Sequence, residues 1–362
     1  MKNFKRLVSI LLCIASVTLL GQVVSADDTN INSEIEETLN SKHKLRFSED
    51  GDFRVLVFSD THRSNDGISD AMNERINTLV DRENPDLIIL CGDNMFHKSV
   101  TDKETFREVM WDVVDYFEEK QIPWMHVYGN HDDEYGLSKE DQQEVYESFD
   151  YCISKDVEEL TGVGNYVHAV YGSNDDEMKF AVWALDSGSY IWNGPEANHP
   201  GGDPYFTNSA YDYIRPDQVE WYKETSKQIQ EYNDGEVVPG LMAFHIPLQE
   251  SYLAYVENNK DSLIDGMFFE GESSCGAHNA GLFDAILERG DVKAIINGHD
   301  HENTFAVKYK DIILSQAGTV SELRFPIQAI FFSILQLPFL HLSSFRVTQP
   351  MEKPPELTFH FT

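Results

Sequence analysis

The chain has 362 residues, of which 41% are hydrophobic and 25% are charged, a composition typical of globular proteins. Its formal net charge is −34, from 62 acidic and 28 basic residues, which argues against nucleic acid or an anionic membrane as the main partner. Such a surface would also repel an anionic substrate, except at a locally positive site of the kind that bound metal ions provide.

The first residues have the pattern of an export signal. A basic start precedes an apolar stretch over 7–20 and the small residues of 24–26. The apolar stretch is short for a membrane span, so it predicts a signal peptide over 1–26 and an exported protein (secreted, extracellular or cell-surface) rather than an anchored one. Residues 27–50 are predicted to be a polar lead-in.

Cysteine usage does not indicate a disulfide scaffold. Removal of the signal leaves Cys91, Cys152 and Cys275, an odd number that permits at most one internal disulfide. The spacing leaves open whether Cys152 and Cys275 pair. Cys91 ends the apolar run LIILC, which predicts a buried thiol.

Apolar runs alternate with helical patterns from residue 53 onward. We predict strands at 53–59, 86–91, 123–128, 178–185, 241–244 and 292–297, and helices at 70–84, 101–119, 216–232 and 281–289. Thr101 and Glu104 suit a capping box, and Pro216 suits the first turn of its helix. Strands that alternate with helices predict an α/β protein.

Polar blocks follow five of the predicted strands. They are DTH (60–62), GDN (92–94), GNHD (129–132), HIP (245–247) and GHDH (298–301). Strand ends carry loops that build sites, so we expect the blocks to lie together. Carboxylate, amide and imidazole groups suit a pair of divalent ions, which can clamp the attacking and leaving oxygens of a displacement at phosphorus. The alternative is a set of unrelated turn and core residues, which the shared strand context disfavours.

This ordered set resembles the calcineurin-like metallophosphoesterase superfamily, whose pattern is D-x-H, GD, GNH-D/E, a lone His and G-H-x-H. The resemblance covers about residues 53–319, and 211–222, 244–248 and 279–301 are similar to the exported phosphatases filed beside purple acid phosphatases. It implies a metallophosphoesterase domain over 51–319. The implied fold is α/β, a two-sheet β-sandwich flanked by helices in four layers, with a dinuclear metal site at the C-terminal strand ends.

The resemblance also implies a role for each matching residue. Asp60, His62, Asp93 and His301 would bind one metal, and Asp93, Asn130, His245 and His299 the other, with Asp93 as the bridge. A hydroxide shared by the metals would attack phosphorus. His131 would assist the leaving group and Asp132 would orient His131. Strand-like alternation would direct Asp60 and His62 the same way and would turn Asp300 away from the metals.

Two positions depart from true purple acid phosphatases. Phe96 stands where those enzymes have a tyrosine ligand, and His62 stands where they have glycine. The resemblance therefore implies two ordinary divalent ions, manganese, zinc or iron, rather than a phenolate-bound ferric ion. The residue types do not decide between these metals.

Further residues have open roles. His97, His199 and His278 could touch substrate or be surface residues, and His126 and His168 are expected in the core. Residues 188–211 form a long segment that we predict to border the active site. Its aromatics, Tyr190, Trp192, Tyr205 and Phe206, could face a leaving group or pack within the segment.

The C-terminal residues 320–362 are atypical. The resemblance ends near Gly318, where further strands would be expected to close the sheet. Residues 327–345 are apolar but include Gln328, Pro338 and His341, so a divergent packing element or a sequence artefact is favoured over a membrane anchor.

These features predict an exported, metal-dependent phosphoester hydrolase. A phosphomonoesterase is favoured, and a phosphodiesterase or nucleotidase is the alternative within the class. The alternative from another class is a catalytically inactive metal-binding protein of the same fold. The expected partner is a small phosphoester, without nucleic acid, and a membrane only if the N-terminal signal or 327–345 anchors the chain. The natural substrate cannot be deduced from the motifs.

Overall fold

The computed structural model divides the chain into two units, Met1–Thr38 and Leu39–Thr362. The described residues are 35–63, 70–96, 100–134, 136–157, 159–191, 210–258, 263–269, 274–320, 330–334 and 357–361. Of the first unit only 35–38 are described, and they are helical. The predicted signal peptide therefore lies outside the described residues, whereas the strands of both sheets belong to the second unit.

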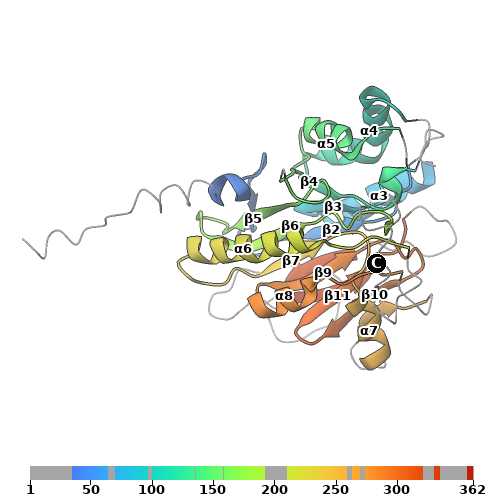
Figure 1. Cartoon of the computed structure of the whole chain (residues 1–362). Helices are drawn as coiled ribbons and strands as arrows, with labels where there is room; N and C mark the ends of the chain where they lie inside the picture. Colours follow the sequence, from blue (N-terminus) through green and yellow to red (C-terminus); the bar gives the residue numbers. More distant parts are fainter. Residues whose placement is uncertain are drawn as a thin grey trace, which may run out of the picture. The chain divides into compact units, whose positions relative to one another are not determined.

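Two β-sheets form the centre of this second unit (Figure 1). The eight-stranded sheet has the order β1 (Leu45–Arg46), β5 (Tyr166–Tyr171), β6 (Met178–Ala184), β7 (Gly240–Ala243), β9 (Val292–Asn297), β11 (Ile312–Gln316), β10 (Thr304–Tyr309) and β8 (Leu263–Met267). The five-stranded sheet has the order β13 (Leu357–Phe361), β12 (Ile330–Ile334), β2 (Val55–Phe58), β3 (Leu87–Cys91) and β4 (Trp124–Val127). The strands β2, β3 and β4 are mutually parallel, as are β6, β7 and β9.

Helices cover the outer faces of both sheets. The described helices are α3 (Asp70–Glu83), α4 (Lys103–Lys120), α5 (Lys139–Ser148), α6 (Pro216–Tyr232), α7 (Gln249–Asn258) and α8 (Leu282–Arg289), with the short 3-10 helix η1 (His131–Asp133). On the small sheet, the Phe117 ring of α4 stacks on Phe58 of β2 at 6.1 Å. On the large sheet, Tyr222 of α6 meets Trp183 of β6 at 5.1 Å. The predicted α/β two-sheet sandwich flanked by helices is thus confirmed.

The sheets pack on each other through the C-terminal ends of their central strands. The Cys91 thiol of β3 lies 3.8 Å from two carbonyl oxygens of the large sheet. One belongs to Phe244, directly after β7, and the other to Ile296 of β9. One buried apolar cluster includes residues of both sheets. Cys91, Cys152 and Cys275 are all buried free thiols, so the two cysteines whose pairing was left open do not form a disulfide.

Most predicted elements are present, and one cap differs. All six predicted strands and four predicted helices occur near their expected ranges. The apolar stripe of α4, Phe106, Val109, Met110, Val113, Val114 and Phe117, is buried. The N-cap of α4, however, is Asp102, whose carboxylate accepts a hydrogen bond from Thr105 N at 2.9 Å. The capping box expected from Thr101 is therefore wrong, because the helix begins one residue later.

Two segments of the atypical tail belong to the small sheet. Strand β12 pairs antiparallel with β2, and β13 pairs antiparallel with β12. The strands expected after Gly318 are therefore present within 330–334 and 357–361. No helix among the described residues is long and apolar enough to cross a bilayer.

Two buried histidines contribute a pH-dependent term to stability. His126 is fully buried, stacks on Tyr146 at 3.6 Å and places Nδ1 2.8 Å from Ser154 Oγ. His168 is also fully buried and places Nε2 2.6 Å from the carbonyl of Ile153. Both are core residues as expected, and burial lowers the pKa of each to about 3.

We expect His126→Phe to weaken the loss of stability in acid. The unfolded histidine has an ordinary pKa of about 6.5, so between about pH 6.5 and pH 3 the unfolded state binds a proton that the folded state does not. The contribution of His126 to stability is therefore fully present above this pH window. Within the window, it lowers the free energy of unfolding by up to ~1.4 kcal/mol for each unit by which the pH decreases. Urea unfolding at several pH values with a chelator should give a smaller slope for the variant. An unchanged slope would contradict the assignment.

Candidate metal centre

The five polar blocks meet at facing sheet edges. In the small sheet they follow β2, β3 and β4, and in the large sheet they follow β7 and β9. His245 Nε2 lies 3.2 Å from Asp93 Oδ2, and His301 Nε2 lies 3.4 Å from Asp60 Oδ1. These pairs join residues more than 150 positions apart, because parallel strands deliver their carboxyl ends to one edge.

The side chains form two adjoining groups of candidate ligands. Asp60, His62 and His301 form one group, and Asp93, His245 and His299 form the other, with their ligand atoms all within 4.8 Å of one another in each group. Between the groups, His62 Nε2 lies 3.8 Å from Asp93 Oδ2 and His245 Nε2 lies 3.9 Å from Asp60 Oδ1. The structure thus brings together the six histidine and aspartate ligands that the resemblance implied.

Several buried polar atoms of the candidate ligands have no hydrogen-bond partner in the described part of the chain. They are Asp60 Oδ1, Asn130 Oδ1, His245 Nε2 and His299 Nε2. Buried polar atoms are normally paired, since leaving one unpaired costs about 1–3 kcal/mol. In contrast, the other polar side-chain atoms of His245 and Asn130 have partners. His245 Nδ1 lies 2.8 Å from Cys91 O, and Asn130 Nδ2 donates a hydrogen bond to the Tyr190 hydroxyl at 3.0 Å. The donor atoms left over suit metal ions.

The backbone at four candidate ligands is unusual. Asp60, His62, Asp93 and His299 have φ values of 54°, 45°, 50° and 78°, in the left-handed region. Non-glycine residues pay a strain energy there, which folded proteins retain mainly at functional sites.

This geometry corrects an expectation about side-chain direction. Strand β2 ends at Phe58, so left-handed turns, and not strand alternation, direct Asp60 and His62 to one place. Asp300 does point away from the metal groups: its carboxylate accepts hydrogen bonds from Ser274 N at 3.1 Å and Asn303 Nδ2 at 3.0 Å. The left-handed turn at His299, rather than strand alternation, therefore sets the direction of the Asp300 side chain.

The site has a buried side and an open side. The side chains of Asp60, Asp93 and His245 are 0–1% exposed. His62, His131 and His301 are 16%, 28% and 34% exposed. Among the described residues, the exposed imidazoles therefore mark the side from which a ligand can approach, and there the half-exposed Phe96 ring lies 4.8 Å from that of His131.

Electrostatics keep the carboxylates ionised. Burial alone would raise the pKa of Asp93, but nearby His245 and His62 outweigh it and lower that pKa to about 2. Burial would lower the pKa of His245, yet the Asp93 and Asp60 carboxylates raise it to about 10. Burial, reinforced by His245, lowers the pKa of His299 to about 4, so this ring is neutral, as a metal ligand must be.

The described contacts of Asp132 are with the backbone, and its expected role in orienting His131 stays a prediction. Its buried carboxylate accepts hydrogen bonds from the backbone N–H groups of Gly129, Asn94 and Met95 at 2.8, 3.3 and 3.1 Å. It therefore ties the loop after β3 to the loop after β4. The acidic group nearest the His131 ring is instead Glu134, whose Oε1 lies 3.0 Å from Nδ1.

The motifs missed Glu134 and gave Tyr190 another role. Glu134 follows His131 by three positions, a spacing that places both on one face of a 3-10 turn and could have revealed it. Tyr190 was expected either to face a leaving group or to pack within its segment. Its hydroxyl accepts from Asn130 Nδ2 and donates to Glu134 Oε1 at 3.1 Å, so it lies within the polar network of the site.

The described ends of the long segment 188–211 border the site as predicted. Tyr190 stacks on Tyr211 at 5.7 Å, and the Tyr211 ring meets His299 at 4.2 Å. Trp192, His199, Tyr205 and Phe206 lie outside the described residues, as does His97.

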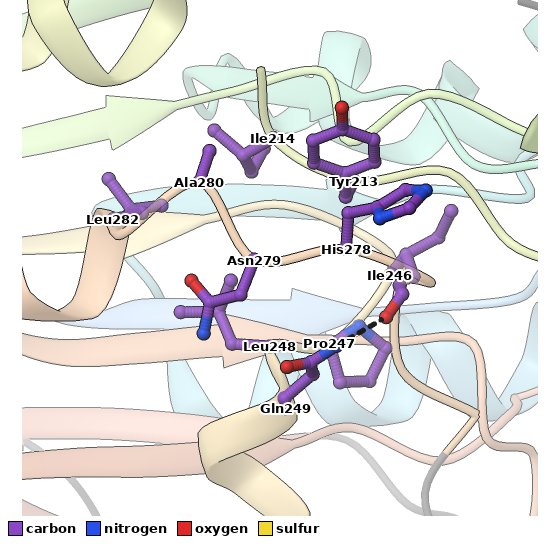
Figure 2. Close-up of a pocket in the computed structure, with 11 residues that line it drawn as sticks. Tyr213, Ile214, Ile246, Pro247, Leu248, Gln249, His278, Asn279, Ala280 and Leu282 are labelled. Carbon is purple, nitrogen blue, oxygen red and sulfur yellow. Dashed lines mark hydrogen bonds between the residues drawn. The ribbon is translucent and has the colours of Figure 1, made fainter. Parts of the chain in front are cut away.

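His278 lines a separate pocket (Figure 2). Its ring lies 5.0 Å from Tyr213, and the pocket continues past Pro247 and Asn279. The space for a water centre is only about 10 Å³, close to the minimum for one water molecule. The pocket is therefore too small for a phosphoester, and His278 is not placed among the candidate ligands.

We expect Gly298→Ala to weaken metal binding. A Cβ at this position would overlap Ser59 Oγ and lie 2.9 Å from Asp60 Oδ2, which Ser59 holds by a 2.5 Å hydrogen bond. Overpacking of this kind costs about 1–3 kcal/mol and should displace Asp60. Calorimetric zinc titration should show reduced affinity. Gly290→Ala, a change at a left-handed helix end with open space around it, should cost stability but leave zinc affinity unchanged. Equal zinc affinities of both variants and the wild type would contradict the prediction.

Comparison with known proteins agrees with this geometry. The model of the family described as calcineurin-like phosphoesterase matches residues 53–303. The chain is 30% identical to a protein of Arabidopsis thaliana named probable inactive purple acid phosphatase 29, over 76% of this chain and 74% of that protein. It is also 30% identical to phosphatase DCR2 of Saccharomyces cerevisiae, over 73% of this chain and 46% of that protein.

Among solved structures, the fold is similar to that of a dimetal phosphatase from Danio rerio. The TM-score is 0.51 at 12% sequence identity, covering 82% of this chain and 99% of the other. The family match spans the blocks that supply every candidate ligand. The chain therefore belongs to the calcineurin-like phosphoesterase family.

Proposed function

We propose that the protein is an exported, metal-dependent phosphoester hydrolase that acts on phosphomonoesters. The observation that carries this proposal is the pair of adjoining ligand groups whose buried donor atoms lack hydrogen-bond partners among the described residues. Export is supported by the basic and apolar pattern of residues 1–26.

The residues fit two divalent ions. Asp60, His62 and His301 would hold one ion, and Asn130, His245 and His299 the other, with Asp93 between them. When bound, two such ions polarise a phosphoryl oxygen and lower the pKa of bound water. Imidazole, carboxylate and amide donors suit manganese, zinc and iron. Imidazole and amide ligands carry no negative charge when they bind a metal, so the ions would keep net positive charge, which would offset the acidity of the surface toward a phosphate.

His131 is the proposed proton donor. Its Nε2 lies 4.0 Å from Asp93 Oδ2, at the open side of the ligand groups. A phosphoester bound there would present its leaving oxygen to this imidazole, which would donate the Nε2 proton as that oxygen departs. The Phe96 ring beside His131 would contact an organic leaving group.

One alternative has a specific observation in its favour. The Arabidopsis thaliana relative is named probable inactive, which favours a metal-binding protein without catalysis. Against it, the six candidate ligands Asp60, His62, Asp93, His245, His299 and His301 are brought together, and Asn130 and His131 are also present. A phosphodiesterase or nucleotidase remains the alternative within the hydrolase class.

The test is hydrolysis of 4-nitrophenyl phosphate and bis(4-nitrophenyl) phosphate. Chelator-stripped protein should be inactive and should recover turnover when manganese, zinc or iron is added, with the monoester preferred. Preference for the diester would favour the phosphodiesterase. Folded protein that binds two equivalents of zinc but hydrolyses neither ester, nor a panel of natural phosphomonoesters, would favour the inactive metal binder.

A further inference from the structure

The carboxylate beside His131 is not the one that adjoins it in sequence. Asp132 is buried and accepts three backbone hydrogen bonds. Glu134 Oε1, in contrast, lies 3.0 Å from His131 Nδ1. The two atoms are at ion-pair distance. Their geometry does not meet the criteria of a hydrogen bond, and Nδ1 has no hydrogen-bond partner among the described residues.

Glu134 is itself held in place from the opposite side. The Tyr190 hydroxyl donates to the same Oε1 atom at 3.1 Å and accepts from Asn130 Nδ2 at 3.0 Å. The path Asn130–Tyr190–Glu134–His131 thus connects a candidate metal ligand with the imidazole at the open side. Because the Asn130 amide gives its N–H to Tyr190, its oxygen is left for a metal.

We propose that Glu134, held by Tyr190, is the residue that positions His131 for proton donation; this inference rests on the proposed function. A carboxylate at Nδ1 fixes the imidazole tautomer with hydrogen on that nitrogen and directs Nε2 toward the ligand groups. In the reaction, the imidazolium gives its Nε2 proton to the leaving oxygen, the P–O bond to that oxygen breaks, water supplies the new oxygen on phosphorus, and the proton that this water releases restores the imidazolium. The ring keeps its Nδ1 hydrogen toward Glu134 throughout.

The first readout is the dependence on leaving group in metal-loaded enzyme. Phenol has a pKa of about 10, like tyrosine, and needs a proton as it leaves far more than 4-nitrophenol does. We expect Glu134→Ala to lower kcat/KM about 10- to 100-fold for phenyl phosphate but less than about threefold for 4-nitrophenyl phosphate. Glu134→Gln, which keeps an acceptor oxygen, should recover most of the loss.

Asp133→Ala is the matched control. It removes a carboxylate from the neighbouring position, where Asp133 accepts from Ser189 Oγ at 3.0 Å, and should change both esters equally. If Glu134→Ala also changes both esters by the same factor, or changes neither, Glu134 does not position the proton donor and the inference is overturned.

The second readout does not need activity. In zinc-loaded protein with 15N-labelled histidine, the ring of His131 should show the tautomer with hydrogen on Nδ1, and Glu134→Ala should mix the two tautomers; the signals are assigned by their loss in His131→Asn. A tautomer that Glu134→Ala leaves unchanged would overturn the inference even in an active enzyme. A tautomer that depends on Glu134 in a protein that hydrolyses no ester would uphold the positioning contact and reject the proposed function.

Discussion

Replacing Asp93 with alanine is expected to abolish ester hydrolysis and to reduce bound metal from two equivalents to at most one. Asp93 is the carboxylate that lies between the two ligand groups, 3.8 Å from His62 Nε2 and 3.2 Å from His245 Nε2. Loss of one ion removes several kcal/mol of transition-state stabilisation, so the rate should fall by at least about 10³-fold. Elemental analysis after dialysis and turnover of 4-nitrophenyl phosphate measure the two effects.

Folding must be compared in the same variant. Asp93 also accepts a hydrogen bond from His131 N at 2.8 Å and carries the charge that His245 faces, so alanine will loosen the loop after β4. Circular dichroism should still show a folded protein. Asp311→Ala, in an exposed turn between β10 and β11, changes net charge equally and should keep both ions and full activity. An Asp93→Ala protein with two tight ions and normal turnover would reject the bridging role.

The candidate ligands could be predicted because each polar block directly follows an apolar strand. Runs such as LIILC and VKAIIN are buried on both faces, as parallel strands in the middle of a covered sheet are, and so they read as continuous apolar segments. Parallel strands place their carboxyl ends at one edge, and whatever polar block comes after them is brought together there.

The strands β5, β10 and β11 have weaker sequence patterns. The hairpin of β10 and β11 turns at Lys310, which has a φ of 53°, and Asp311, without the Asn-Gly or Asp-Gly pair that marks such a turn in sequence. Strand β5 contains His168, whose polar side chain interrupts the apolar pattern but is satisfied by a backbone carbonyl. In both, contacts made only in the folded chain replace the local pattern.

The roles of Asp132 and Glu134 show the same limit within the site. The family resemblance favoured Asp132 as the partner of His131. The left-handed turn at Asp93, however, carries the N–H groups of Asn94 and Met95 to the Asp132 carboxylate, 38 and 37 positions away in the chain, respectively. Once those donors hold Asp132, the 3-10 turn of η1 leaves Glu134 beside the ring. Long-range backbone donors of this kind leave no trace in a motif.

Replacing His131 with asparagine is expected to separate catalysis from metal binding. His131 is 28% exposed, and its ring is not among the grouped candidate ligands, so both ions should remain. Loss of a general acid costs about 10²–10⁴-fold in kcat. The loss should be at the high end for phenyl phosphate, whose leaving oxygen must be protonated, and at the low end for 4-nitrophenyl phosphate.

Two controls decide whether the loss is chemical. His278→Asn, in the small pocket of Figure 2, removes an imidazole at a distance from the ligand groups and should change neither ester. Zinc stoichiometry should be two in wild type, His131→Asn and His278→Asn alike. If His131→Asn lost one ion, His131 would be a ligand rather than a proton donor. If it kept both ions and hydrolysed the two esters at the wild-type ratio, the leaving group would depart without help from this imidazole, and Glu134 would have nothing to position.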